Sequence, residues 1–93
     1  FDQVALEHLR TEGDVAAEVG QVLDNLAAVA EAAGGSLDQM VKLTVYLTDL
    51  GDFGTVNEVM SARFSEPYPA RAAIEVAGLP KGARVEIDGI MVR

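Results

Sequence analysis

The sequence contains no cysteine and no tryptophan, and His8 is its single histidine. Without cysteine the chain forms no disulfide and offers no thiolate to a metal ion. A zinc ion at His8 would depend on carboxylates for most of its ligands, and no ligand spacing surrounds this residue. We therefore expect no metal site, and we interpret His8 as structural or simply exposed.

Basic residues are also scarce, with 7 Lys and Arg against 15 Asp and Glu, which gives a formal net charge of −8. Such a surface repels phosphate backbones and anionic lipids, so we expect neither a nucleic-acid nor a membrane partner. No apolar run approaches the roughly 18 residues that indicate a transmembrane helix. No basic, apolar leader opens the chain at Phe1. These features favour a cytoplasmic location.

The chain has 93 residues, which predicts a single domain over residues 1–93. A domain of this size buries a modest share of its surface, so its stability is marginal without further help. Because 49% of the residues are apolar, we expect that help to come from association of subunits.

Residues 15–33 carry apolar side chains at spacings of three and four, which predicts an amphipathic helix. Asp14 can accept hydrogen bonds from the first-turn N–H groups, and Gly34-Gly35 can end the helix in a left-handed turn. Glu18 and the other carboxylates of this segment are expected on its solvated face. The preceding residues, 1–13, suggest an irregular or weakly helical segment.

The rest of the chain predicts one more helix and three strands. Residues 36–40 suggest a helical turn capped by Ser36, and residues 41–48 alternate strictly, as in a strand with one buried face. A second helix is expected over residues 53–64, capped by Asp52 and ended by the prolines that follow. Residues 70–77 and 83–92 read as two strands joined in a hairpin through "GLPKG".

These elements predict a two-layer α+β sandwich with two helices packed on one face of a β-sheet. The alternation assigns Thr44, Tyr46, Arg71 and Ala73 to the other face of that sheet. This face is too apolar in places for plain exposure to solvent. We therefore expect it to form a subunit interface.

Arg71 is the residue most suited to chemistry, and two interpretations of it stay open. In the simpler one, Arg71 forms an ion pair with Glu75 or Glu86. In the other, its guanidinium presents paired donors to the carboxylate of a ligand, and Glu86 acts as an acid–base or water-orienting group. The second interpretation needs both side chains on one face, and a one-residue change of strand register reverses that relation.

The segment "PARAAIEVAGLPKGARVEI" resembles the C-terminal signature of the RidA/YjgF family of enamine and imine deaminases. The segment from Asp14 to Val59 is similar to the central region of the same family, so the resemblance runs from near Asp14 to the end. It implies a chorismate-mutase-like fold and a homotrimer with clefts between neighbouring subunits. The implied reaction is hydrolysis of 2-aminoacrylate and related imines to 2-keto acids and ammonia, without a metal or other cofactor.

The resemblance also implies roles for individual residues. Arg71 matches the arginine that binds the substrate carboxylate, Glu86 matches the glutamate that places water or a proton, and Asn57 matches an asparagine near the cleft. Ala73 stands where most members have cysteine. The family begins with two further strands that contribute to the cleft, and we expect this chain to lack them.

Two other functions compete with the deaminase. The same fold could serve as a non-catalytic module that binds small carboxylates or another protein. Ribonuclease activity has also been attached to this family, but the net charge of −8 and the lack of a basic patch argue against RNA as a substrate here.

Overall fold

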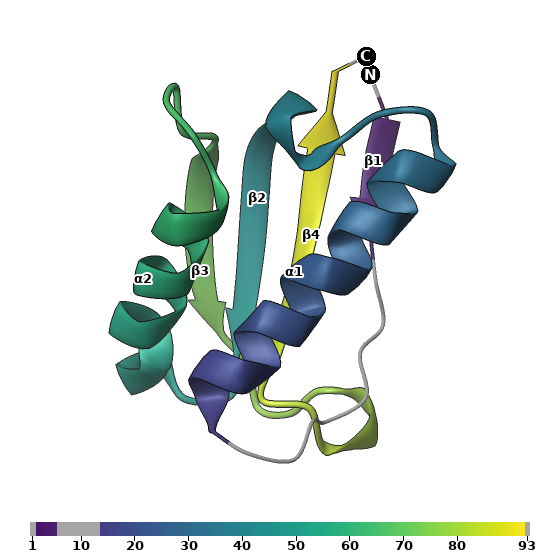
Figure 1. Cartoon of the computed structure of the whole chain (residues 1–93). Coiled ribbons are helices and arrows are strands. Elements are labelled where there is room, and N and C mark those ends of the chain that lie inside the picture. The colour runs from purple at the N-terminus through teal and green to yellow at the C-terminus, as the bar shows by residue number, and fades with distance from the viewer. Residues whose placement is uncertain (1, 6–13, 93) are drawn as a thin grey trace.

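A computed structural model describes the backbone of residues 2–5 and all of residues 14–92. His8 and most of the segment expected to be irregular lie outside the described residues. Within those residues the structure has two α-helices and four strands (Figure 1). They are β1 (Asp2–Ala5), α1 (Val15–Ala32), β2 (Met40–Leu47), α2 (Phe53–Arg63), β3 (Ala70–Glu75) and β4 (Val85–Met91).

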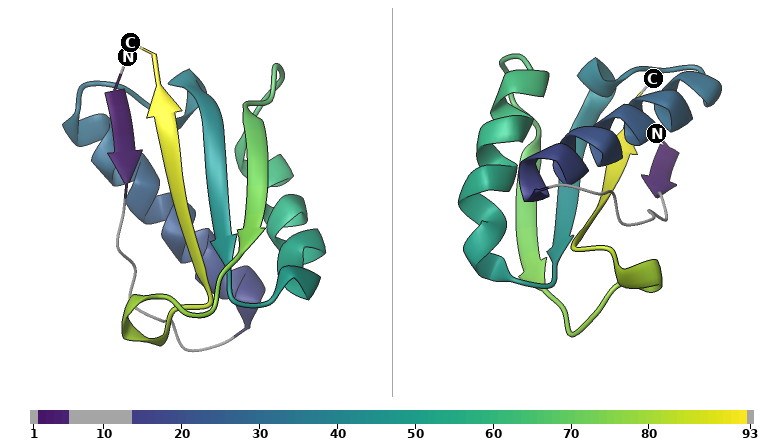
Figure 2. Two further views of the ribbon diagram at one scale, coloured as in Figure 1. Left: turned by 180° about the vertical axis from the view of Figure 1, so that it is seen from behind. Right: turned by 60° about the horizontal axis from the view of Figure 1, so that its bottom comes forward.

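The strands form one sheet in the order β1-β4-β2-β3. β3 runs parallel to β2, whereas β4 is antiparallel to both β2 and β1. Both helices cover the same face, and the view from behind in Figure 2 shows the other face uncovered. The predicted two-layer α+β sandwich is therefore confirmed, and none of the described helices is long and apolar enough to cross a membrane.

Two predictions about the strands are wrong. The backbone of Asp2–Ala5 forms strand β1 beside β4, although this part of the sequence suggested irregular structure. The two C-terminal strands do not form a hairpin, because β2 lies between β3 and β4. The physical reason is the crossover through α2, which returns the chain parallel to β2 and leaves β3 at the edge of the sheet.

Most of the helix ends form as the sequence predicted. Asp14 Oδ1 accepts a hydrogen bond from the Ala17 N–H at 2.9 Å, and Gly34 adopts a φ of 89° just after α1. Ser36 is the N-cap of the 3-10 turn Leu37–Gln39, as expected, and its N–H donates to Gln39 Oε1 at 3.0 Å. Asp52 makes no side-chain hydrogen bond at the start of α2, contrary to expectation. The carboxylate of Asp49 accepts instead from the Gly51 N–H, at 2.9 Å.

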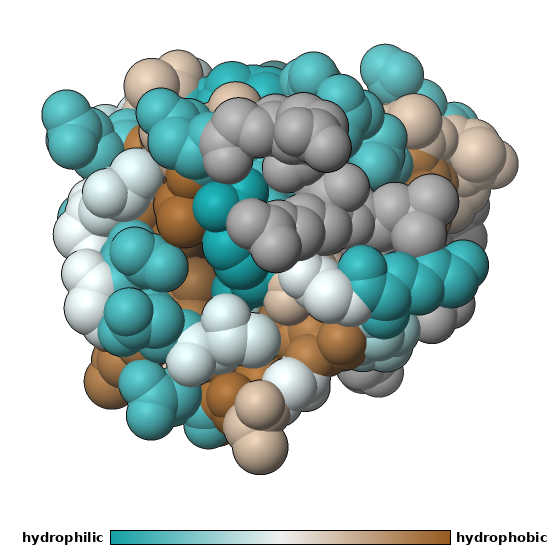
Figure 3. Space-filling model, turned by 90° about the horizontal axis from the view of Figure 1, so that it is seen from below, coloured by the Kyte–Doolittle hydropathy of each residue, from teal (hydrophilic) through white to brown (hydrophobic). Residues whose placement is uncertain are grey.

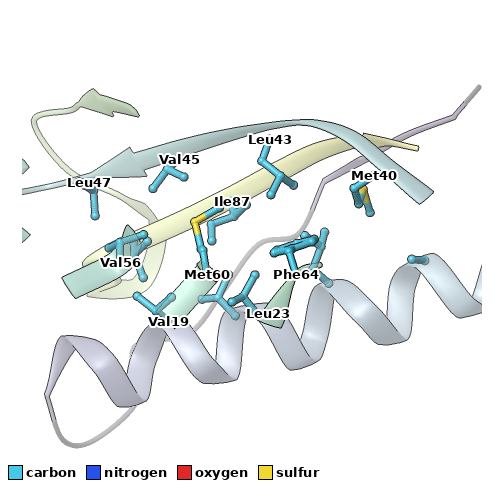
Figure 4. Close-up of a cluster of buried hydrophobic side chains, with 14 of the residues drawn as sticks. Val19, Leu23, Met40, Leu43, Val45, Leu47, Val56, Met60, Phe64 and Ile87 are labelled. Carbon is cyan, nitrogen blue, oxygen red and sulfur yellow. The ribbon is translucent and has the colours of Figure 1, made fainter. Parts of the chain in front are cut away.

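The hydrophobic core fills the space between the helices and the sheet (Figure 4). Alternate side chains of β2 point towards α1 and α2 and are buried with Ile87 of β4. Each large aliphatic side chain buried in this way stabilises the fold by about 1.5–3 kcal/mol. The main contributors are Val19, Leu23, Leu26, Leu43, Val45, Leu47, Val56, Met60 and Ile87.

Gly89 lets β2 and β4 pack closely on the core side of the sheet. A Cβ atom at this position would lie 2.8 Å from Met40 Sδ and 2.9 Å from Leu43 Cδ2. Both neighbouring side chains are buried, so they have little room to move away.

We predict that Gly89→Ala lowers the free energy of unfolding by about 1–3 kcal/mol, because the added methyl group overpacks the core. Gly54→Ala in α2 is the matched control, since a Cβ atom there meets nothing within 4 Å. The control should leave stability unchanged or raise it by about 0.4–1 kcal/mol. Urea unfolding of both variants tests this, and equal midpoints would contradict it.

Candidate functional site

Arg71 lies on the edge strand β3, on the side of the sheet that carries the helices. It pairs in register with Leu43 of β2, and Ala73 pairs with Val45. Since paired residues project to the same face, Arg71 and Ala73 lie on the core side, where Ala73 packs against the core. Their predicted place on the open face is wrong, because the parallel pairing with β2 sets the opposite alternation.

Arg71 is half-buried, and its guanidinium makes no ion pair or side-chain hydrogen bond with any residue that the structure describes. The carboxylate of Glu75 accepts a hydrogen bond from the Leu50 N–H at 2.8 Å. Pairing of Arg71 with Glu75 or Glu86, the simpler interpretation, is therefore not found among the described residues. A half-buried guanidinium without an acidic partner is suited to binding an anion.

Glu86 lies in β4, one of the two inner strands, on the open face of the sheet. It is half-buried and stands directly opposite Tyr46 of β2. The Tyr46 hydroxyl donates to Asp88 Oδ2 at 3.2 Å. Glu86 is thus part of a cluster of two carboxylates and one phenol on the face that no helix covers. The prediction that Tyr46 and Thr44 lie on this open face is confirmed.

The register answers the question that the sequence left open. Leu43 stands opposite Arg71 on one side and opposite Gly89 on the other. Glu86 is three residues before Gly89, and neighbouring side chains alternate between faces. Arg71 and Glu86 of one chain therefore project to opposite faces of the sheet.

Asn57 is half-buried in α2, and this helix packs on the same side of the sheet as Arg71. The structure thus brings Asn57 and Arg71 to one side of the sheet and Glu86 to the other. The structure does not bring these three residues together in a single chain.

A cavity of about 590 Å³ lies elsewhere, at the end of the sheet where β2 begins and β4 ends. Three exposed apolar side chains line it: Val41, Tyr68 and Val92. Asp38 and Glu66 are its charged residues, so it is poorly suited to an anionic ligand. This cavity was not predicted from the sequence, although the segment 66–69, "EPYP", which lines it, was its visible signal.

The described residues contain no group of three or more His, Cys, Asp or Glu side chains that could hold a metal ion. The side chains of these elements are suited to anion binding at Arg71 and to proton transfer at Glu86, Asp88 and Tyr46.

The fold and this residue set define a class, the two-layer α+β proteins of the chorismate-mutase-like type. The family model described as Endoribonuclease L-PSP matches residues 3–93. The chain belongs to this family, which is also known as RidA/YjgF.

Curated relatives carry different names, and two of them illustrate the range of similarity. A RutC family protein of Sinorhizobium fredii is 58% identical over 71 residues, which cover 76% of this chain and 56% of the relative. A 2-iminobutanoate/2-iminopropanoate deaminase of Rattus norvegicus is 51% identical over 81 residues, covering 87% of this chain and 59% of the relative. The chain thus spans less than two thirds of the length of these relatives.

Solved structures agree with the fold. RidA from an Antarctic Psychrobacter superposes with a TM-score of 0.84 at 55% identity, covering 89% of this chain and 67% of that one. TdcF of E. coli, solved with bound serine, gives a TM-score of 0.81 at 38% identity, covering 90% and 68%.

We predict that the Tyr46 phenol titrates above its ordinary pKa of 10.0, because burial disfavours the phenolate and the carboxylates of Asp88 and Glu86 repel it. A raised pKa in the folded state stabilises the fold below the ordinary value, and this contribution is lost as the pH rises through the folded pKa.

Ultraviolet titration measures this pKa, and Tyr68→Phe removes the only other tyrosine. Asp88→Asn in that background should bring the pKa of Tyr46 closer to 10.0, since it removes a negative charge. An unchanged pKa would refute the contribution of Asp88.

Proposed function

We propose that the protein hydrolyses 2-aminoacrylate and small 2-imino acids to 2-keto acids and ammonia, which removes reactive intermediates. The observation that carries the proposal is that Arg71 is half-buried and its guanidinium has no acidic partner among the described residues. Relatives of about half identity named 2-iminobutanoate/2-iminopropanoate deaminase support it. The relative solved with bound serine supports a ligand that carries an α-carboxylate.

In this reaction Arg71 binds the carboxylate of the imine through two parallel N–H donors. Glu86 orients a water molecule and accepts its proton while the water oxygen attacks the C=N carbon. 2-Aminoacrylate enters as its imine tautomer. Glu86 passes the proton taken from water to the imine nitrogen, which gives a carbinolamine. The hydroxyl proton of the carbinolamine then moves to its amino group, the C–N bond breaks, and ammonia leaves as the C=O bond forms. The imine carbon is already electrophilic, so fixed orientation supplies much of the acceleration. Asn57 lines the Arg71 side of the cleft in this proposal.

Arg71 and Glu86 lie on opposite faces of one sheet, so in this proposal the two residues of one cleft come from two copies of the chain. If the open face of one subunit packs against a neighbouring subunit, its Glu86 can reach a ligand that is bound at Arg71 of that neighbour. We therefore propose a homotrimer in which each cleft takes Arg71 from one subunit and Glu86 from the next. Burial of the open face in this assembly also supplies the stability that a small domain lacks.

Arg71→Ala should lower kcat/KM for 2-iminopropanoate by about 100-fold or more, because the carboxylate loses its anchor. Arg71→Lys is the matched control: it keeps the charge but not the paired donors, so we expect a raised KM with a smaller loss of kcat. Release of ammonia with each variant, together with sedimentation to verify the assembly, measures this. Undiminished turnover by Arg71→Ala would refute the deaminase site.

A wild-type protein that binds 2-keto acids without turning over imines would instead establish the non-catalytic carboxylate-binding module. RNA is a poor alternative ligand, despite the family name Endoribonuclease L-PSP, because the net charge of −8 opposes a phosphate backbone.

Mixing of inactive subunits tests the shared cleft. Arg71→Ala and Glu86→Gln subunits, unfolded together and refolded in equal amounts, should recover about a quarter of the wild-type activity, since a quarter of the clefts receive both intact residues. Each variant refolded alone is the control and should stay inactive. Absence of recovery in a correctly assembled mixture would contradict a cleft shared between subunits.

A further inference from the structure

Glu18 is the one charged side chain that is fully buried among the described residues. It lies in the first turn of α1, where the sequence pattern predicted a solvated carboxylate, and that prediction is wrong. The helix itself is already capped by Asp14. Helix formation therefore gives no reason for a buried carboxylate at this position.

The Glu18 carboxylate binds the chain at the start of β4, at the lower end of the molecule in Figure 1. Its Oε2 accepts hydrogen bonds from the backbone N–H of Arg84 at 2.7 Å and of Val85 at 3.2 Å. Its Oε1 accepts from Arg84 Nε at 2.7 Å. Seen from below in Figure 3, strongly hydrophilic side chains are set between apolar ones at this end.

These bonds hold the two residues that immediately precede Glu86. The Thr48 N–H also donates to the Arg84 carbonyl oxygen at 3.1 Å, so the chain is held from the sheet as well as from α1. β4 begins at this point, and its second residue is Glu86, which belongs to the cluster with Asp88 and Tyr46 on the open face. The carboxylate thus fixes where β4 starts.

A carboxylate is a costly choice for a buried position, since an apolar side chain of similar volume often stabilises as well. The other ion pair of the described residues, Arg63–Asp24 at 2.9 Å, joins α1 to α2 with an Asp24 side chain that is 63% exposed. That pair shows how the same helix makes an ordinary surface contact. Glu18 differs because its bonds are directional, buried and aimed at the backbone of β4.

We infer that Glu18 is a positioning residue for the proposed reaction, and that it acts by fixing the backbone before Glu86. The inference rests on the proposed function. Under this inference, Glu18 determines the placement of Glu86. Binding of the substrate carboxylate by Arg71 does not depend on Glu18.

The test compares Glu18→Ala, Glu18→Asp and Glu18→Gln in the full assembled protein. Pyruvate titration counts the binding-competent clefts and gives the Kd, and kcat is expressed per such cleft. Glu18→Ala and Glu18→Asp should each lower kcat per cleft by about tenfold or more, because small misplacements of a catalytic group are costly. The Kd for pyruvate should stay within about twofold, since Arg71 is unaffected.

Glu18→Gln retains an oxygen that can accept the backbone N–H groups, so it should recover most of the kcat per cleft. Val19→Ala is the matched control: it removes buried volume from the same turn of α1 but no bond to β4. It should lower the thermal midpoint and leave kcat per cleft unchanged. If Glu18→Ala does not fold, Glu18→Asp provides the same comparison.

Glu18→Asp with wild-type kcat per cleft, or with kcat and pyruvate affinity reduced equally, would overturn the inference and leave the proposed function standing. A wild-type protein without imine hydrolysis would overturn the proposed function, and the inference with it.

Discussion

The pairing of β2 with two different strands determines most of this structure. β3 joins it in parallel and β4 in antiparallel orientation, and the register of each pair decides which side chains face the helices. The apolar side of β2 is buried against α1 and α2, so a one-residue shift on either side would bring polar residues into the core. The same registers send Arg71 to the helix side and Glu86 to the open side.

In the proposed trimer, the open face of each sheet contacts neighbouring subunits. A single chain presents Arg71 on one side of its sheet and the cluster of Glu86, Asp88 and Tyr46 on the other. The proposed trimer brings them together without moving either strand, because Arg71 comes from one subunit and Glu86 from its neighbour. Glu18 fits the same account, because a shared cleft needs Glu86 held firmly by its own subunit before the neighbour meets it.

The sequence predicted the helices, β2, the two-layer fold and the family, because these depend on local periodicity and a long motif. It did not predict the order of β3 and β4, which follows from the α2 crossover between distant residues. The faces of Arg71 and Ala73 were wrong for that reason. The burial of Glu18 was missed because its partners, Arg84 and Val85, lie 66 and 67 residues further along the chain.

The central claim is that one ligand contacts Arg71 and Glu86 of different subunits. A crystal structure of the assembled protein with a bound 2-keto acid tests it most directly. We expect the ligand carboxylate to lie within hydrogen-bonding distance of the Arg71 guanidinium, with Glu86 of a neighbouring copy nearer to the ligand than Glu86 of the same chain. A ligand that contacts both residues of one chain, or one bound away from Arg71, would contradict the account.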